Sequence, residues 1–435
     1  MAYAARRDSA RFVVGSVSVA HFLSHFYFLV FPPLFPLFVD EFGVSNTQLG
    51  LLFSLVFLMP SVLQLPVGDL VDRVGAQPVL VAGMAVTGLG ISATALANSY
   101  LALLGFALLG GVGQSVFHPA DLALLETVSD AGNEGKSYGT HTFAGFLGFA
   151  AGPLVAGGLA LRFGWQPALA GLGLVGVAYA AVLYLTMAPV HRGRGAAGDD
   201  ADGGSDAGDD AVAAASDAGD DAVDADPDSD ADGGGLRSTW AVLTRPPVLA
   251  TFLFFVLLTV SSTGIQSFTV VFLTDAVGLD AGPANTTLTA NLTATALGVL
   301  AGGVLADRIS IHAILLTTLS VAGVLVGVIV AGVLPPTYLV TLATFSVLGL
   351  IHGLALPSRD SLVSSFSTSD TTGKSFGFAY TGVTIGAFVA PVMLGFVSDT
   401  LDERVMYATI GVFYAASVLT VAALALGVVG GDGDG

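Results

Sequence analysis

Titratable side chains inside long apolar segments are the residues of this sequence best suited to chemistry. Such a group is costly within a membrane unless it faces a cavity or a partner, so each is a candidate proton carrier. The candidates are His21, His25, His118, Asp121 and His352. His21 and His25 are one helical turn apart, and Asp121 follows His118 by three residues, so each pair shares a helix face. A free imidazole titrates at about pH 6.5, within the range that a proton gradient spans.

Structural roles are the alternative for these residues. Asp121 can equally belong to a structural ion pair, as can Glu126, Arg359 and Asp360 near helix ends, or the side chains can extend toward the membrane surface. His141 lies in the next apolar segment after His118. We favour His118 with Asp121 as the proton site, because Pro119 between them removes a backbone donor and loosens the helix locally.

Uncharged polar side chains form a second set, suited to lining a substrate cavity. The candidates are Gln114, Gln266, Ser262, Asn291 and Thr295. Hydroxyl and amide groups also join neighbouring helices within membranes, so packing is the alternative for each of them. No phosphate-binding G-x-x-x-x-G-K-[ST] loop occurs, and ATP as an energy source is therefore unsupported. The chain has no cysteine, and we expect neither a metal site nor a cofactor.

Composition defines the class of protein that holds these residues. Of 435 residues, 54% are hydrophobic and only 11% are charged, too few charges for a soluble surface and enough length for many membrane crossings. The net charge of -19 comes largely from residues 195–235, which contain 14 Asp and no Lys or Arg. Dense acidic charge with few lysines is typical of a salt-rich cytoplasm, and we interpret the source as a halophilic microbe.

Twelve apolar segments of membrane-spanning length are expected, which makes the protein all-α and polytopic. We expect helices at Phe12–Val39, Thr47–Leu70, Pro78–Ala97, Leu101–Leu125, Ser137–Leu161, Pro167–Met187, Pro247–Thr274, Pro283–Leu305, Ile311–Val333, Thr337–Ser364, Ser375–Asp399 and Val405–Val429. Three parts follow from this pattern. They are a first six-helix half (1–187), an acidic linker (188–245) expected to be disordered, and a second six-helix half (246–435).

The two halves repeat each other in sequence. The stretch from Gly68 to Gly75 reads Gly-Asp-Leu-Val-Asp-Arg-Val-Gly, and a version returns 235 residues later as Gly303-Val-Leu-Ala-Asp307-Arg308. At an offset of 238 residues, Gly-Lys-Ser at 135–137 returns at 373–375, and the Pro at 153 returns at 391. The chain therefore contains one six-helix unit written twice.

These repeated loops resemble the signature of the major facilitator superfamily. The resemblance implies two parallel repeats with the substrate held between them. It also implies that the loops latch the cytoplasmic side shut, with Asp72 at the start of helix 11 and Asp307 at the start of helix 5, where helix N-termini attract carboxylates. The latch residues would be Gly68, Asp72, Arg73, Gly75, Lys136, Asp307, Arg308 and Lys374. The alternative is that Arg73 and Arg308 only set topology.

Helices 1 and 4 carry a narrower resemblance, to the fosmidomycin-resistance branch, which exports drugs in exchange for protons. His21 and the Phe117-His118-Pro119 triplet match that branch, whereas His25 and Ala120 stand where it has acids. Helix 5 also resembles the antiporter motif of the superfamily, with small-residue helix packing as the alternative. The motif residues are Gly148, Gly152, Pro153 and Gly157, and helix 11 has Ala390 in place of the second glycine.

Basic residues predict the orientation of the chain. All but Arg162 and Arg404 fall at the end of the bundle that carries both termini, so we expect that end to be cytoplasmic and the protein to lie in the cell membrane. The expected function is proton-coupled export of a small organic compound by a monomer in contact with lipid, without nucleic acid and without enzyme activity. Proton-coupled uptake, or a sensor built on the same fold, are the alternatives.

Overall fold

The computed structural model describes residues 2–129, 134–187, 244–365 and 372–428. Within these ranges the chain is helical and has no strand. Twelve helical spans are long and apolar enough to cross a membrane, as the sequence predicted. The expected disorder of the acidic linker concerns residues 188–243, which lie outside the described ranges.

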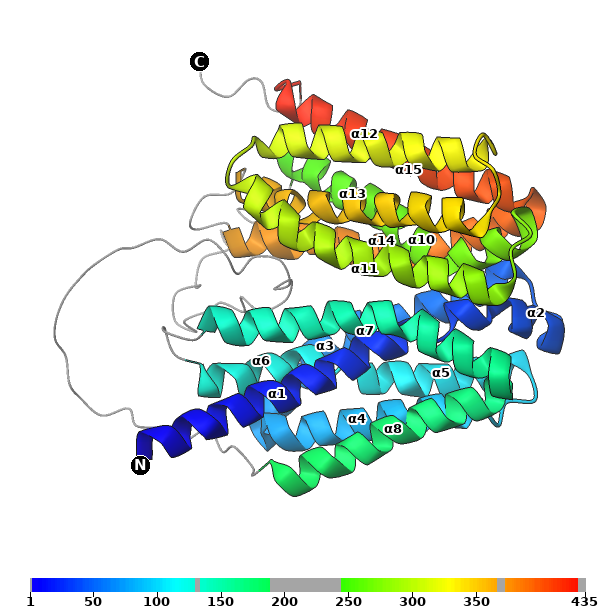
Figure 1. Ribbon diagram of the computed structural model, residues 1–435. Helices are drawn as coiled ribbons and strands as arrows, with labels where there is room; N and C mark the ends of the chain where they lie inside the picture. The colour runs from blue at the N-terminus through cyan, green and yellow to red at the C-terminus, as the bar shows by residue number, and fades with distance from the viewer. Residues whose placement is uncertain (1, 130–133, 188–243, 366–371, 429–435) are drawn as a thin grey trace, which may run out of the picture.

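The first half forms six spans, shown from blue to green in Figure 1. Its helices are α1 (Ala2–Phe28), η1 (Pro32–Leu34), α2 (Phe35–Phe42), α3 (Asn46–Val74), α4 (Ala76–Thr94), α5 (Tyr100–Gln114), α6 (Phe117–Val128), α7 (Glu134–Phe163) and α8 (Trp165–Thr186). The first span runs through α1, η1 and α2, and the fourth through α5 and α6.

The second half repeats this arrangement. Its helices are α10 (Pro246–Val271), η2 (Phe272–Ala276), α11 (Ala281–Ala306), α12 (Ile311–Val330), α13 (Tyr338–Ser365), α14 (Thr372–Thr400) and α15 (Glu403–Ala425). α1 begins and α15 ends at the same end of the bundle, on the left of Figure 1, and we call that end the termini face.

Proline interrupts two spans that the sequence analysis treats as single helices. The fourth span breaks between Gln114 and Phe117, just before Pro119. Because proline has no N–H and its ring clashes with the carbonyl four residues earlier, the helix cannot continue regularly through Ser115. The first span breaks after Phe28 for the same reason, since Pro32 and Pro33 follow. The predicted loosening around Pro119 is therefore present.

Local signals explain where α3 begins and ends. Ser45 accepts a hydrogen bond from the Gln48 backbone at 3.3 Å, and the Gln48 side chain accepts one from the Ser45 backbone at 3.0 Å, which together form a capping box. α3 ends at Gly75, whose φ of 99° favours a residue without a side chain. Gly75 is the closing glycine of the first repeated loop, which we call an Asp-Arg loop after Asp72 and Arg73, and the backbone needs a glycine there. The position that corresponds to it in the second Asp-Arg loop is Ser310, whose φ of -50° does not require a glycine.

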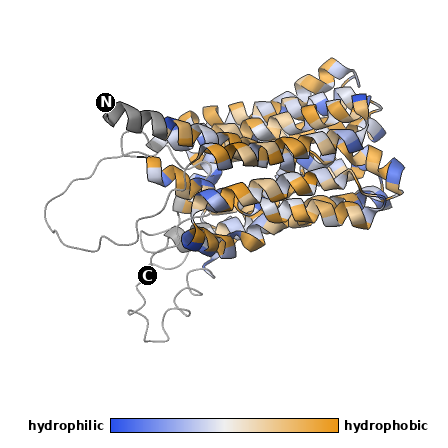
Figure 2. Ribbon diagram, turned by 90° about the horizontal axis from the view of Figure 1, so that it is seen from below, coloured by the Kyte–Doolittle hydropathy of each residue, from blue (hydrophilic) through white to orange (hydrophobic). Residues whose placement is uncertain are grey.

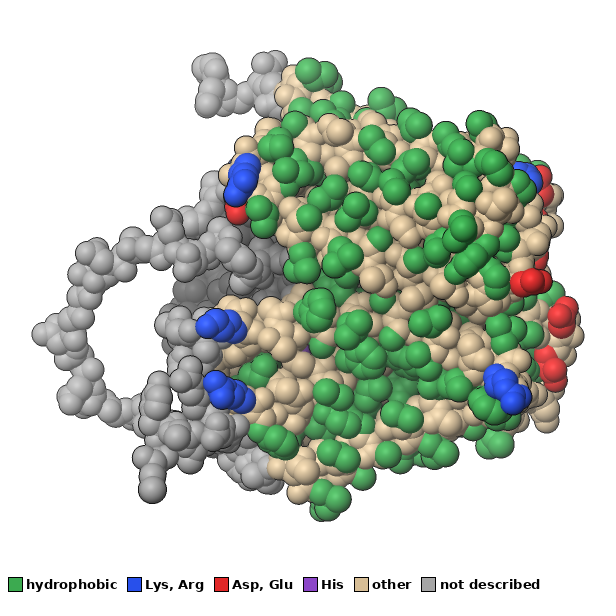
Figure 3. All heavy atoms as spheres, viewed as in Figure 1, with side chains coloured by type: hydrophobic (Ala, Val, Ile, Leu, Met, Phe, Trp, Pro, Cys, Tyr) green, Lys and Arg blue, Asp and Glu red, His purple; other side chains and the backbone are tan. Residues whose placement is uncertain are grey.

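Hydrophobic residues cover the length of the bundle, and charges gather at its two ends (Figures 2 and 3). Exposed leucines such as Leu101, Leu185 and Leu339 lie on helices of both halves. A belt of exposed apolar side chains between two charged ends is the surface that a bilayer requires. The protein is therefore a multi-pass membrane protein.

The two halves meet mainly through two pairs of helices, α3 with α14 and α7 with α11. Gly50 of α3 lies against the backbone of Pro391, and Gly157 of α7 lies against Asn285 of α11. These contacts are far from the termini face. The part of α3 that approaches the termini face runs from Phe57 to Leu70, and none of its residues is buried. The halves are thus closed on one another at the opposite face and separated at the termini face.

Candidate functional site

Four histidines and one aspartate converge inside the first half. α1 contributes His21 and His25, α6 contributes His118 and Asp121, and α7 contributes His141. The rings of His21 and His141 stack with centroids 3.8 Å apart, and the ring of His25 lies 4.2 Å from that of His21. The His118 ring meets those of His21 and His25 at 5.5 and 6.2 Å.

The Asp121 carboxylate lies at the centre of this cluster. Its Oδ2 atom is 3.4 Å from Nδ1 of His21 and 3.8 Å from Nε2 of His141. The three residues are almost fully buried, at 3%, 0% and 3% exposure for His21, Asp121 and His141. A buried carboxylate requires a compensating partner, because burial of an unpaired charge is very costly. The site therefore calls for a cation, in the form of a proton on the cluster or of an ion.

Bonding at the cluster is incomplete in the described part of the chain. The atoms without a hydrogen-bond partner there include both carboxylate oxygens of Asp121, Nδ1 of His21 and both ring nitrogens of His141. Buried polar atoms in proteins are nearly always paired, so such a concentration marks a place where a further partner binds.

Small and polar residues hold the cluster in place. A side chain at Gly145 would meet ring atoms of His21 and His25 at 2.7 Å, so only glycine leaves room for both rings beside α7. Gln114 fixes α1 to α5, because it accepts from the Ser24 hydroxyl and donates to the Ser24 carbonyl, both at 2.8 Å. Gln114 is thus a positioning residue, with both ends of its amide already bonded.

Sequence reasoning found most of this cluster and missed one essential member. It selected His21, His25, His118 and Asp121, but it paired Asp121 with His118, whereas the contacts of the carboxylate are with His21 and His141. His141 precedes Gly145 by four residues and shares its helix face, a signal that could have placed it beside α1. His352 belongs elsewhere, because it is buried in the second half with its Nδ1 2.9 Å from the Tyr414 hydroxyl.

The polar candidates for a substrate cavity divide into bonded and available groups. Asn291 donates to the Phe345 carbonyl of α13 at 2.8 Å, so it joins two helices of the same half. Ser262 and Thr295 donate to carbonyls of their own helices. Gln266 is partly buried on α10 and is not among the buried atoms that lack a partner. Its role in a substrate cavity stays a prediction.

The glycines of the antiporter-like motif act as close-packing positions. A side chain at Gly148 would lie 2.2 Å from the Phe22 carbonyl, and one at Gly152 would lie 2.9 Å from that of Phe26, so both bring α7 against α1. Gly157 instead lies at the contact between the halves, where Asn285 occupies the space. Pro153 is inside α7, which remains one helix through it.

The predicted latch lies at the termini face, where the halves are apart. Asp72, Arg73, Asp307 and Arg308 are exposed, as is Lys136 at the start of α7. Lys374 and Ser375 fall where side chains lie outside the described residues, so the contact of Asp72 with the start of helix 11 stays a prediction. No hydrogen bond or ion pair of Asp307 with α7 occurs among the described side chains.

A carboxylate joins the two halves at the opposite face, and the sequence analysis did not single it out. Asp399, near the end of α14, accepts hydrogen bonds from the backbone N–H groups of Asn46 and Thr47, both at 2.8 Å, and one from the Thr47 hydroxyl. Ser398 accepts another from the Asn46 amide at 3.0 Å. Asp399 thus caps the N-terminus of α3 across the interface, and we call this contact the Asp399 gate.

The second half has a buried ion pair of its own. Arg359 of α13 contacts Asp360 at 2.7 Å, and the Tyr380 hydroxyl of α14 donates to the same carboxylate at 2.9 Å. The guanidinium lies 5.0 Å from the Phe255 ring centroid, a cation–π distance. Of the alternatives in the sequence analysis, the structural ion pair is the one that this geometry supports for Arg359 and Asp360.

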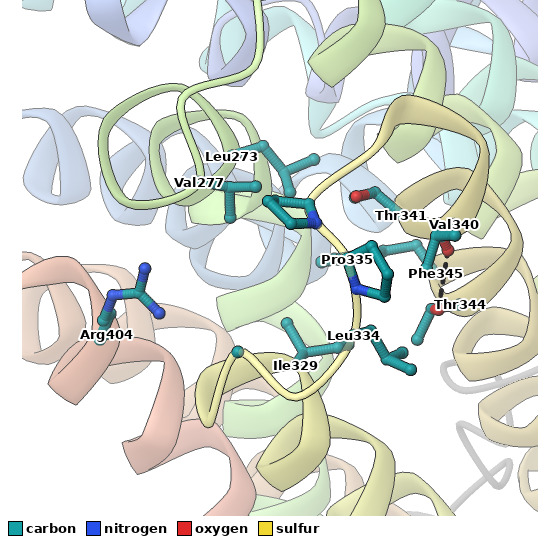
Figure 4. A pocket seen from close by; sticks show the side chains of 12 residues that line it. Leu273, Val277, Ile329, Leu334, Pro335, Val340, Thr341, Thr344, Phe345 and Arg404 are labelled. Atoms are coloured by element: carbon teal, nitrogen blue, oxygen red, sulfur yellow. Dashed lines mark hydrogen bonds between the residues drawn. The ribbon is translucent and has the colours of Figure 1, made fainter.

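A separate cavity of about 180 Å³ lies at the opposite face within the second half (Figure 4). Its walls are apolar, with Leu273, Val277 and Phe345 among them, and Arg404 is its charged side chain. The Arg404 guanidinium donates to the carbonyls of Val330 and Ala276, the last residues of α12 and η2, so it joins the ends of these two helices. This cavity contains no titratable member of the histidine cluster.

The family of the chain follows from these features and from comparison. A two-part bundle of twelve spans with an interface between the halves defines a transporter fold, and a family model of the Major Facilitator Superfamily matches residues 17–391 and 255–430. The chain belongs to the major facilitator superfamily, and it is a transporter rather than an enzyme.

Individual relatives agree with the resemblance seen in the sequence. The fosmidomycin resistance protein of Escherichia coli K12 is 30% identical over 152 residues, which cover 35% of this chain and 37% of that protein. Multidrug resistance protein MdtG of Yersinia enterocolitica is 33% identical over 152 residues, which cover 34% and 36%. The chain thus matches about a third of the length of these relatives.

A solved structure supports the fold over nearly the whole chain. The crystal structure of a bacterial homolog of the human lysosomal transporter Spinster, in an inward-facing and occupied conformation, aligns with a TM-score of 0.74. The alignment covers 96% of this chain and 97% of that one, at 14% sequence identity. This likeness concerns the fold alone.

Proposed function

We propose that this protein is a secondary active transporter that exports a small organic compound in exchange for protons. The observation that carries the proposal is the buried cluster of His21, Asp121 and His141, which requires a cation and whose polar atoms include several without a hydrogen-bond partner among the described residues. The relatives named for fosmidomycin and multidrug resistance support export of a drug-like compound.

Alternating access supplies the mechanism. In the described state the halves are joined by the Asp399 gate and parted at the termini face, so a compound can enter between them from that face. Rocking of one half against the other would break the Asp399 gate and bring the Asp-Arg loops against the opposing helix starts. Protons would then reach the cluster from the opposite side.

Titratable groups from four helices surround the proposed proton site. Besides Asp121, they are His21 and His25 on α1, His118 on α6 and His141 on α7. Tyr179 on α8 interacts electrostatically with Asp121 while its hydroxyl donates to the Ser16 carbonyl. Neutral imidazoles cannot balance the negative charge of the Asp121 carboxylate. We therefore assign the transported proton to Asp121 and the histidines around it, which would share it.

Orientation completes the proposal. Basic residues gather at the termini face, which we therefore assign to the cytoplasm of a cell membrane, with the protein acting as a monomer among lipids. The dense acidic charge of the linker fits a halophilic source, where salt screens repulsion. Export would then move the compound from the termini face to the opposite face.

Proton movement in proteoliposomes tests the proposal. The probe is fosmidomycin, chosen from the named relative, together with a panel of drug-like compounds, and the readout is a pH-sensitive dye inside the vesicles. We expect an imposed gradient of the compound to drive protons in the opposite direction in the wild type, which the dye reports. Movement in the same direction as the protons would establish uptake instead.

Asp121→Asn should abolish the dependence on the gradient while binding of the compound remains measurable. His352→Gln is the matched control, since it alters a buried histidine bonded to Tyr414 outside the cluster. Gradient-driven transport that survives Asp121→Asn, His21→Gln and His141→Gln, singly and together, would refute the assignment of the proton site.

A further inference from the structure

The unpaired atoms of the cluster lie close to the spacing of ligands around one ion, with one separation inside the tetrahedral range and the other slightly beyond it. Direct hydrogen bonds would bring Nδ1 of His21 and Nε2 of His141 to about 2.7–3.0 Å from the carboxylate, whereas the observed separations are 3.4 and 3.8 Å. Atoms that coordinate a tetrahedral ion at about 2.0–2.2 Å are about 3.3–3.6 Å apart. One ligand atom from each of His21, Asp121 and His141 can be chosen so that all lie within 4.8 Å of one another.

The donor types indicate which ion fits. Two imidazole nitrogens and one carboxylate oxygen suit the first-row divalent transition metals. Mg²⁺ and Ca²⁺ prefer six or more oxygen ligands, and this site offers only the oxygens of one carboxylate. Three protein ligands also leave a position of a four-coordinate ion for water or for a donor atom of another molecule.

The surroundings meet the other needs of such a site. All three ligand residues are more than nine-tenths buried and rise from separate helices, so their side chains are fixed by packing rather than by a loop. Both carboxylate oxygens and both His141 nitrogens lack hydrogen-bond partners among the described residues, so no hydrogen bond would have to break for them to coordinate. Gly145 keeps the space beside His21 open.

We propose that His21, Asp121 and His141 bind one divalent transition-metal ion of the Zn²⁺ and Co²⁺ class. The sequence predicts no metal site, because the convergence of His141 with the other two residues is a property of the folded chain, and the proposal differs from that prediction. The inference goes beyond the proposed transport function, since binding requires neither a substrate nor a gradient. Because the metal and the protons use the same atoms, metal would inhibit proton exchange competitively.

Cobalt absorption tests the site directly. Full-length protein is purified in detergent, stripped with a chelator and titrated with Co²⁺, whose visible bands intensify strongly when water ligands are replaced by a four-coordinate protein site. We expect saturation at one Co²⁺ per chain and loss of the bands on addition of Zn²⁺. A titration that gives only the weak bands of aqueous Co²⁺ would overturn the proposal.

Two variants and a matched control identify the ligands. Asp121→Asn and His141→Gln should each weaken Co²⁺ binding by about 100-fold or more, because loss of even an outer-shell partner costs about 10- to 100-fold. His352→Gln, a buried histidine of the second half, should bind as the wild type does. Equal binding in all four proteins would place the metal elsewhere and refute the site.

X-ray absorption of the Zn²⁺-loaded wild type covers the case in which a variant fails to fold. We expect a first coordination shell of oxygen and nitrogen atoms around Zn²⁺, together with the outer-shell scattering of two imidazole rings. A spectrum without imidazole scattering would refute the assignment. Failure of the metal site is distinguishable from failure of the transport proposal. Proton exchange is measured in chelator, where no metal is present, and metal binding is measured without a gradient.

Discussion

Replacement of Asp399 by asparagine should open the contact between the halves at the opposite face. Asp399 belongs to α14, yet its carboxylate caps α3 of the other half by accepting from two backbone N–H groups and one hydroxyl. Asparagine has one oxygen instead of two and no charge, so it can replace only part of this pattern. The state described here should therefore lose stability relative to the state with the termini face closed.

The magnitude follows from the interactions lost. One or two hydrogen bonds contribute about 0.5–1.5 kcal/mol each, and a negative charge at a helix N-terminus adds about 0.3–1 kcal/mol. Asp399 is exposed, which reduces both contributions through solvent screening. A loss of about 1–2 kcal/mol remains, equivalent to a shift of about 5- to 30-fold in the ratio of the two states.

Spin labels at the termini face can measure this shift. The chain has no cysteine, so Val74→Cys and Ile309→Cys create a clean labelling pair on exposed positions of opposite halves. We expect pulsed electron resonance to show a larger fraction of short distances in Asp399→Asn than in the labelled parent.

Asp402→Asn is the control for this measurement. Asp402 caps α15 within its own half, accepting from the Val405 backbone at 2.8 Å, and does not cross the interface. Distances unchanged by Asp399→Asn, or changed equally by Asp402→Asn, would refute the role of the Asp399 gate.

Three further predictions concern the cluster, the latch and the linker. Gly145→Ala should displace the rings of His21 and His25 and should impair gradient-driven transport, at a cost of about 1–3 kcal/mol of stability from overpacking. Gly139→Ala on the same helix is the control, because the added methyl group meets nothing within 4 Å, and it should be neutral in melting and transport assays. Asp72→Asn should nearly abolish transport, and Asp307→Asn should slow it less, because the second loop lacks the closing glycine; equal effects in initial-rate measurements would contradict this. Replacement of residues 196–234 by a neutral flexible segment of equal length should leave the transport rate unchanged, and a loss of rate in correctly inserted protein would assign the acidic tract a working role.

Sequence periodicity predicted the spans because each depends on local composition alone. The break before Pro119 was also predictable, since the missing N–H is a property of a single residue. The pairing of Asp121 with His141 was not, because it depends on how α6 and α7 are rotated against α1. That rotation is set by close packing at Gly145 and Gly148. The sequence places Gly148 in the antiporter-like motif but does not show that this helix face meets α1.

The Asp399 gate was beyond sequence reasoning for a related reason. An aspartate at the end of a helix is an ordinary surface residue until the N-terminus of another helix is placed beside it. Asp399 and Asn46 are 353 residues apart and belong to different halves. Under the alternating access proposed above, their contact would exist in only one of two arrangements, so no single pattern along the chain encodes it.

All members of the histidine cluster come from α1, α6 and α7, so under the proposed rocking of the halves the site would move as one unit with the first half. A ligand displaces a conformational equilibrium only by the difference between its affinities for the two states. Direct contacts within one half are the same in both states and contribute no difference. The difference in cation affinity between the two states must then arise from a change in the hydration of the cluster and from side chains of the second half that approach the cluster on closure. Substitutions in the second half should accordingly change the number of protons moved per substrate while leaving the intrinsic cation affinity of the isolated first-half site unaltered.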